Sequence, residues 1–324
     1  MGFRWLRVLV AGLSLVVIIG GLSWFVVVLL PEWTVGHDVS ALSPSERLAT
    51  VGSVRAQWIT WTSVITGLGV GAYGVYRFYL DKDKQRLDQD KHLTGLFDSA
   101  TGRLESDDAT VRAGGLRTLF RLMVDSPRDH TAVVDTVCDV LRHRAHSDGD
   151  GPLPRDVAAA ADALRDRPDR PEARPLDLAG IRLPEARWRG IRLAGAELAG
   201  IRLERAELTG ADLTGAILTD ADLSGANLVG SSGAGAQLRN AVLAEADLSS
   251  ADLREADLTR ARLRGANLTR TVLTRANLAD TDLGGTDLHD ALGVTSSAVR
   301  GAIVDDKTVL PPGVDHPRLR ASRG

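Results

Sequence analysis

The sequence has little cysteine and almost no aromatic side chains beyond its first third. Its 324 residues include a single cysteine, Cys138, which excludes an internal disulfide and a cysteine-based zinc site and favours a buried structural thiol. After Phe120 the one aromatic residue is Trp188, although five of the six tryptophans lie at or before residue 61. The net charge of −3 provides no global basic surface, so direct nucleic-acid binding is not expected. This uneven composition predicts differently built regions in one chain.

Charge is absent from two stretches near the N-terminus. Residues 8–30 are 23 residues without a charged side chain, enough to cross about 30 Å of hydrocarbon as a helix. Residues 58–76 are also uncharged, and Ser63, Gly67 and Gly71 share one helical face that a neighbouring helix can approach closely. Tryptophan and tyrosine residues lie near the expected ends of both stretches. The sequence therefore predicts two transmembrane helices, the alternative for 58–76 being a loosely packed amphiphilic segment.

Positive charge predicts the orientation of this pair. Residues 31–57 contain two arginines, whereas five basic residues follow the second stretch: Arg77, Lys82, Lys84, Arg86 and Lys91. The positive-inside rule then predicts a multi-pass protein of the cell membrane with its N-terminus and C-terminal repeat domain in the cytoplasm. A cleaved signal peptide competes for the first stretch, but that stretch is longer than a usual signal core and no small-x-small cleavage site precedes Pro31. The same basic residues could also bind anionic lipid head groups directly. The alternative, which we prefer, is that they only set the topology.

The middle of the chain has the spacing of short amphipathic helices. Val133, Val134, Val137, Cys138 and Leu141 form one apolar stripe, and similar stripes occur within 93–104 and 116–123. Asp107 or Asp108 is expected to cap a helix, and "DSPRD" at 125–129 to separate two helices. Residues 162–175, with three prolines among charges, are expected to end a short helix and serve as a linker.

His143 and His146 invite a metal interpretation that the surrounding residues do not support. A three-residue histidine spacing is common, and the following "SDGDG" lacks the further ligand spacing and terminal glutamate of a calcium loop. A solvated helix end is therefore expected rather than a metal site.

The most regular feature is leucine at every fifth position from Leu178 to Leu288. It fills 21 of 23 such positions, the exceptions being Trp188 and Gly233. A five-residue step turns an α-helix by about 500° and would scatter the leucines, and an odd step alternates the faces of a strand. Alanine stands two residues before the leucine in 15 of the 23 repeats, so both are expected to point inward, with turn-forming residues after the leucine. The chain must therefore bend once per repeat around a leucine-filled axis.

These repeats resemble a known family. "ADLTG", "ADLSG", "ANLVG" and "ADLTR" resemble the pentapeptide repeat, whose consensus is A(D/N)LXX, over about residues 176–290. The resemblance implies a right-handed quadrilateral β-helix with four repeats per coil, and 23 repeats imply a rod about 28 Å long. The expected fold class is thus mixed: two N-terminal transmembrane helices, a small α-helical segment and a pentapeptide-repeat solenoid. The expected domains are a transmembrane hairpin at 1–80, a helical segment and linker at 81–172, the β-helix at 173–292, and a cap with a disordered tail at 293–324.

The repeats contain no recognisable catalytic constellation. Asp247, Asp252 and Asp257 fall on adjacent sides of the coil and are expected to be solvated and to favour local turns. No nucleophile–base pair or phosphate-binding loop stands out. We therefore expect no enzyme, no cofactor, and no catalytic, cofactor-binding or metal-binding residues.

The charges of the repeats are banded along the sequence. Acids dominate from Glu207 to Asp257 and arginines from Arg260 to Arg275, which suits an unidentified protein partner on the β-helix sides or, equally, solubility. The first hypothesis is a membrane-anchored cytoplasmic interaction scaffold, of unknown oligomeric state. The alternative, implied by the resemblance, is a DNA-mimicking inhibitor or protector of DNA gyrase, although 17 acids against 13 arginines give a weak negative bias.

Gly233 interrupts the leucine register without shifting it. Leu228 and Leu238 lie ten residues apart, so the count continues through the interruption. The sequence predicts a vacant core position that loosens one side of one coil, with a partner-specific dent as the alternative.

Overall fold

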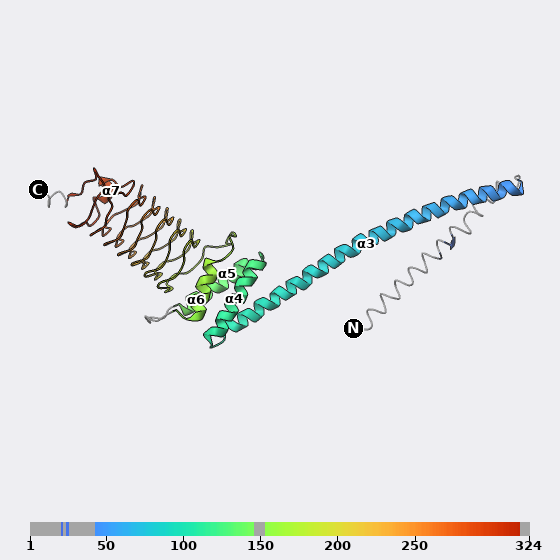
Figure 1. The fold of residues 1–324 in the computed structure, drawn as a ribbon, viewed down its shortest axis with the longest axis horizontal. Coiled ribbons are helices and arrows are strands. Elements are labelled where there is room, and N and C mark those ends of the chain that lie inside the picture. The colour runs from blue at the N-terminus through green and yellow to red at the C-terminus, as the bar shows by residue number, and fades with distance from the viewer. Residues whose placement is uncertain (1–20, 22–23, 26–42, 146–152, 318–324) are drawn as a thin grey trace. The chain divides into compact units, whose positions relative to one another are not determined.

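The computed structural model of the chain describes residues 21, 24–25, 43–145 and 153–317 (Figure 1). Two compact units are residues 1–90 and 91–324. The helices are α3 (Pro44–Leu104), α4 (Ala109–Asp125), α5 (His130–Arg144), α6 (Arg155–Arg165) and α7 (Ser296–Val299). Helix α3 continues through residue 80, where the sequence placed a domain boundary. The domain boundaries expected from the sequence stay predictions.

The prediction of transmembrane helices is wrong for the described residues. None of the helices described is both long enough and apolar enough to cross a bilayer. Residues 58–76 lie within α3, where four glycines dilute the apolar character that the absence of charge indicated: Gly67, Gly69, Gly71 and Gly74. The first candidate span, 8–30, falls almost wholly outside the described residues. The same finding overturns the predicted multi-pass location in the cell membrane.

Helices α4, α5 and α6 pack into a small bundle in the second unit. The predicted stripe of α5 is buried, as are Leu116, Leu119 and Met123 of α4, which confirms the amphipathic pattern. Asp108 caps α4 by accepting a hydrogen bond from the Thr110 backbone N–H at 2.7 Å. The predicted break at 125–129 is also confirmed, because α4 ends at Asp125 and α5 begins at His130.

Two close contacts fix how the bundle packs. The end of α3 approaches α4 at Gly115, where an added Cβ would lie 2.7 Å from the Ala100 carbonyl oxygen. Arg112 of α4 donates from Nε to Oδ2 of Asp156 in α6 at 2.6 Å, and both side chains are buried. A buried ion pair costs much to desolvate, so removing one partner is expected to destabilise the bundle strongly.

The leucine repeats form a stack of coils, drawn from yellow to red in Figure 1. Parallel bridges join residues twenty apart, from Asp177 with Glu197 to Val272 with Leu292, so four repeats make one coil. Within each bridge the backbone alternates: the Leu183 N–H donates to the Arg202 oxygen, and the Arg202 N–H donates to the oxygen of Ile181, both at 2.8 Å. All 21 leucines are at most 4% exposed, as the inward position predicts.

The extended sides of each coil are too short to form β-strands. Among the described residues the repeats form isolated bridges and no strands of several residues. Each side pairs through the single residue before the leucine, because the two residues after the leucine turn the corner. The expected β-helix is therefore corrected to a coil of isolated bridges and turns.

Positive backbone φ angles make the corners. The second residue after the leucine has a positive φ in every repeat from residue 180 to 285, for example 65° at Gly200 and 59° at Ser250. The N–H of Ala186 donates to the Leu183 oxygen across such a corner at 3.3 Å. A positive φ at the third position of a four-residue turn is the geometry of a type II turn.

The helical bundle covers the first coil. Trp188, which replaces a core leucine, is 1% exposed and donates from Nε1 to the Ala161 oxygen of α6 at 3.2 Å. The Arg182 N–H donates to the Ala145 oxygen at 2.7 Å. The predicted linker is held in place, because Arg170 donates to the oxygens of Met123 and Val124. These bonds join the bundle and the solenoid into one packed unit.

The last coil is covered by residues that leave the repeat register. The final bridges, Asp282 with Ile303 and Asp287 with Val309, span more than twenty residues. The predicted short helix near Ser296 is α7, capped by the Thr295 hydroxyl, which accepts from the Ala298 N–H at 3.2 Å. Val299 of α7 is fully buried against the coil. Both ends of the stack are thus covered, as stacked folds require.

Candidate functional site

The stacking of coils places the outward residues of the repeats in four columns. Each outward residue precedes a core leucine, and the bridges align it with the residue twenty positions later. One column, which we call the acid–amide face, has only acid and amide side chains beyond the first coil: Glu207, Asn227, Asp247, Asn267 and Asp287. Consecutive members are one coil apart, about 4.8 Å.

Hydrogen bonds order the side chains of the acid–amide face. Asn227 donates from Nδ2 to Oε2 of Glu207 at 3.3 Å, and Asn267 donates from Nδ2 to Oδ1 of Asp247 at 3.0 Å. Asp247 and Asp287 each accept, through Oδ1, the backbone N–H two residues later, at 3.0 and 2.9 Å. These Asx turns hold the carboxylates of Asp247 and Asp287 against the corner.

The acids of this face form no salt bridge with the described residues. Among the described residues, no salt bridge involves Glu207, Asp247 or Asp287, whereas each of the other three columns has an acid paired with an arginine. Those pairs are Asp177 with Arg142, Asp257 with Arg239, Asp282 with Arg264, and Asp252 with Arg254. An unpaired carboxylate at the surface is available to a cation of a partner.

The acids that pair with arginine on the other columns have lowered pKa values. The hydrogen bond from the Arg254 side chain lowers the pKa of Asp252 below its ordinary value. Partial burial raises the pKa of Asp257, but hydrogen bonds from Thr259 and Arg239 outweigh burial and leave this pKa lowered. These acids are already engaged within the protein.

The predicted placement of the central aspartates, on adjacent sides and in local turns, is confirmed. Asp247, Asp252 and Asp257 occupy three different columns, and each accepts the backbone N–H two residues later, from Ser249, Arg254 and Thr259. They are not brought together as a carboxylate pair.

No metal or thiol chemistry is indicated in the described part of the chain. His143 is exposed at the end of α5, His146 lies outside the described residues, and no described cluster of three or more potential ligands can hold a metal ion. Burial raises the pKa of the Cys138 thiol to about 12, which makes it unreactive at neutral pH.

Some members of the predicted charge bands pair with each other across coils. Arg275 pairs with Glu255 and Arg260 with Asp280, both twenty residues apart, because one coil returns the chain to the same corner. The acid–amide face was missed in the sequence, since its signal appears only when every twentieth residue is compared.

Comparisons with known proteins concern the repeat region. The family described as Pentapeptide repeats matches in eight copies, over residues 196–232, 221–260, 234–270 and 251–290. Solved structures that match part of this chain include QnrB1, a plasmid-mediated fluoroquinolone resistance protein, at 22% identity over 45% of this chain and 84% of that chain, with a TM-score of 0.33. HetL, a pentapeptide repeat protein involved in heterocyst differentiation regulation from Nostoc sp. strain PCC 7120, is 28% identical over 42% of this chain and 81% of its own, with a TM-score of 0.18. No curated protein matches the chain by sequence.

Proposed function

Because the repeat region of this chain belongs to the pentapeptide-repeat family, we propose that the protein is a non-catalytic interaction scaffold whose acid–amide face binds a basic surface of a partner protein. The observation that carries this proposal is the line of three carboxylates, Glu207, Asp247 and Asp287, without a salt bridge among the described residues. Complementary charge favours encounter and orientation with the correct partner.

The geometry defines what the partner must present. Successive acids are two coils apart, so their spacing is about 10 Å, and the intervening asparagines keep the line polar. Backbone bonds between coils fix this spacing before binding, which reduces the entropy lost on association. A surface with lysine or arginine side chains at a similar spacing fits the face.

A charge-only substitution tests the proposal. The triple variant Glu207→Gln, Asp247→Asn, Asp287→Asn retains side-chain oxygens that accept the Asx-turn hydrogen bonds but removes the charge. Tagged wild-type protein and the variant are used to purify partners from native cell extract, with quantification by mass spectrometry. We expect a specific protein to be retained by the wild type and lost with the triple variant. The matched control, Glu197→Gln and Asp212→Asn, changes two acids on other columns and retains the partner. Equal retention by all three proteins contradicts the proposal.

DNA imitation is the second candidate, and the same line of acids is its only support. One strand of duplex DNA carries about one charge per 3.4 Å, so a length of about 19 Å carries roughly six, against three acids on this face. The density therefore favours a protein partner with few cations. Supercoiling by purified gyrase tests the alternative: inhibition by the wild type that the triple variant lacks supports DNA imitation, and unchanged supercoiling at high protein concentration excludes it.

A further inference from the structure

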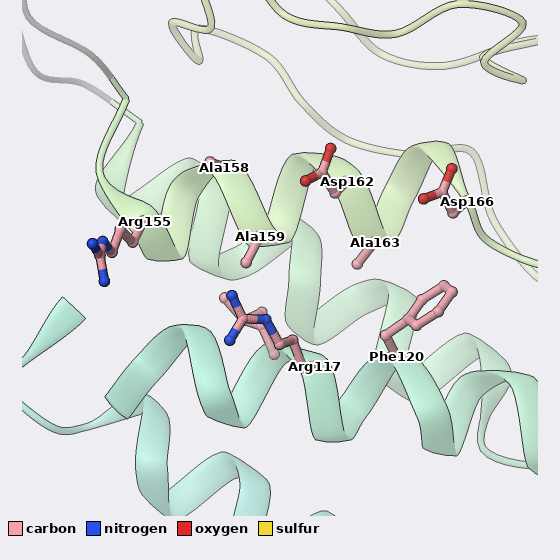
Figure 2. A pocket seen from close by; sticks show the side chains of 9 residues that line it. Arg117, Phe120, Arg155, Ala158, Ala159, Asp162, Ala163 and Asp166 are labelled. Carbon is pink, nitrogen blue, oxygen red and sulfur yellow. The ribbon is translucent and has the colours of Figure 1, made fainter. Parts of the chain in front are cut away.

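A hollow with an apolar floor lies between α4 and α6, away from the acid–amide face in the sequence. Its volume is about 370 Å³, within the range of ligand-binding clefts. Ala159 and Ala163 of α6 point toward α4, from which Phe120 rises at one end (Figure 2). Leu116 is fully buried beneath this surface. Alanines on the floor leave room for a helix to approach closely.

The rim of the hollow carries two arginines and two aspartates, and only the aspartates are paired. Asp162 and Asp166 line it, but both pair with Arg165, whose Nη1 and Nε lie 2.9 and 2.7 Å from their carboxylate oxygens. Arg117 and Arg155 are exposed and form no salt bridge within the described parts of the chain. The guanidinium groups in Figure 2 therefore stand beside the apolar floor with their charge available.

The outer surface of α4 extends this positive character. Arg121 lies one helical turn beyond Arg117 and is also exposed, whereas Arg112 is buried against Asp156. Val111 and Val124 of the same helix are each 42% exposed. These two valines lie outside the hollow, where an occupant meets Phe120, Ala159 and Ala163 beside Arg117 and Arg155.

We propose that the α4–α6 groove is a docking site for an acidic amphipathic helix of a partner protein. An apolar side chain of that helix seats over Ala159 and Ala163, and its carboxylates pair with Arg117 and Arg155. The mode is a helix laid into a groove between two helices, with charge complementarity selecting acidic sequences. This site is distinct from the acid–amide face, which repels the same ligand.

The test uses the full chain and a defined probe. The probe is a fluorescein-labelled helical peptide of repeated Glu-Leu-Leu-Glu-Ala-Leu-Glu sequence, with a lysine-for-glutamate peptide as its control, and binding is followed by anisotropy. We expect Arg117→Glu and Arg155→Glu each to weaken peptide binding about tenfold, which corresponds to about 1.4 kcal/mol of binding free energy. Arg189→Glu, at an exposed arginine of the first coil, is the matched control and leaves the affinity unchanged.

A second variant separates the groove from general electrostatics. Ala159→Leu fills the hollow without changing charge, and we expect it to weaken the peptide about tenfold while the thermal midpoint is maintained. The proposal is overturned if the peptide does not bind, if the lysine peptide binds as tightly, or if Arg189→Glu weakens binding equally. Unchanged affinity in Ala159→Leu overturns it as well. Octanoate binding without peptide binding assigns the hollow to a small carboxylate instead.

Discussion

Replacing Gly233 with leucine tests whether the interruption of the leucine register is a packing defect. Gly233 belongs to the core column that contains Leu213 and Leu253 in the adjacent coils. Its backbone bonds match those of a leucine position: its N–H donates to the Asp252 oxygen at 2.7 Å, and its oxygen accepts from the Ala236 N–H at 3.0 Å. Its φ is not positive, so a side chain adds no backbone strain. Only the side chain departs from the repeat.

The vacancy is partly filled by Leu253. A Cβ at position 233 would lie 2.9 Å from Cδ2 of Leu253, which is the far end of a rotatable side chain. Burial of a leucine contributes about 2 kcal/mol, and loss of glycine's freedom in the unfolded chain adds about 0.5 kcal/mol. Moving Leu253 costs about 1 kcal/mol. The net gain of about 1.5 kcal/mol corresponds to a rise of about 3–6 °C in the midpoint for a unit of this size.

Thermal unfolding of the full chain, followed by circular dichroism, measures this change. Gly233→Ala is the control, because it adds only the Cβ that meets Leu253, and its midpoint is expected to stay within about 2 °C of the wild type. A lower midpoint for Gly233→Leu refutes the reasoning, since Leu253 then cannot yield space.

Three further predictions concern the bundle, the C-terminal cap and acid stability. Asp156→Asn removes the charge partner of the buried Arg112 guanidinium and is expected to lower the free energy of unfolding, measured by urea titration, by about 3–5 kcal/mol. The control Asp162→Asn, at an exposed acid, is expected to change this free energy by about 0.5 kcal/mol or less. Equal effects of the two substitutions would contradict the importance of the buried pair. Gly293→Ala, at φ 75° with its Cβ 2.7 Å from a Cα of the neighbouring coil, lowers this free energy by about 2 kcal/mol or more, and Gly301→Ala by about 0.5 kcal/mol or less. Similar losses would refute the crowding argument. Because an arginine hydrogen bond lowers the pKa of folded Asp252, its stabilisation is full above the unfolded pKa of about 4 and is lost as the pH falls through the folded value. Between about pH 5 and pH 3, the thermal midpoint should therefore fall less steeply for Asp252→Asn than for the wild type. Identical slopes would contradict a stabilising role of the Asp252 carboxylate.

The inward half of the solenoid follows from the sequence because burial depends on local alternation. The five-residue period placed leucines and alanines in the core, and both sets are buried. The polar residues after the leucine predicted the corners, which have positive φ angles. The buried hydroxyl of Thr271 fits the same position because it donates to the Leu248 oxygen at 2.8 Å.

The arrangement of the outward side chains depends on contacts between coils, so it could not be predicted from residues that are neighbours in the sequence. Apparent bands of charge became salt bridges once residues twenty apart were adjacent, as with Arg205 and Glu185 at 3.1 Å. The contact between Trp188 and α6 likewise requires the tertiary position of the bundle. Absence of charge also gave a false transmembrane prediction at 58–76, since glycine is neutral without being strongly apolar.

The twenty-residue bridge register restricts how this protein can change length during evolution or engineering. Each bridge pairs a residue with its counterpart one full coil later. Inserting or removing twenty residues preserves every column, whereas a change of five moves all later side chains to the adjacent side. The acid–amide face can therefore be lengthened or shortened only in whole coils, and a single duplicated pentapeptide would scramble the surface while leaving the leucine core intact.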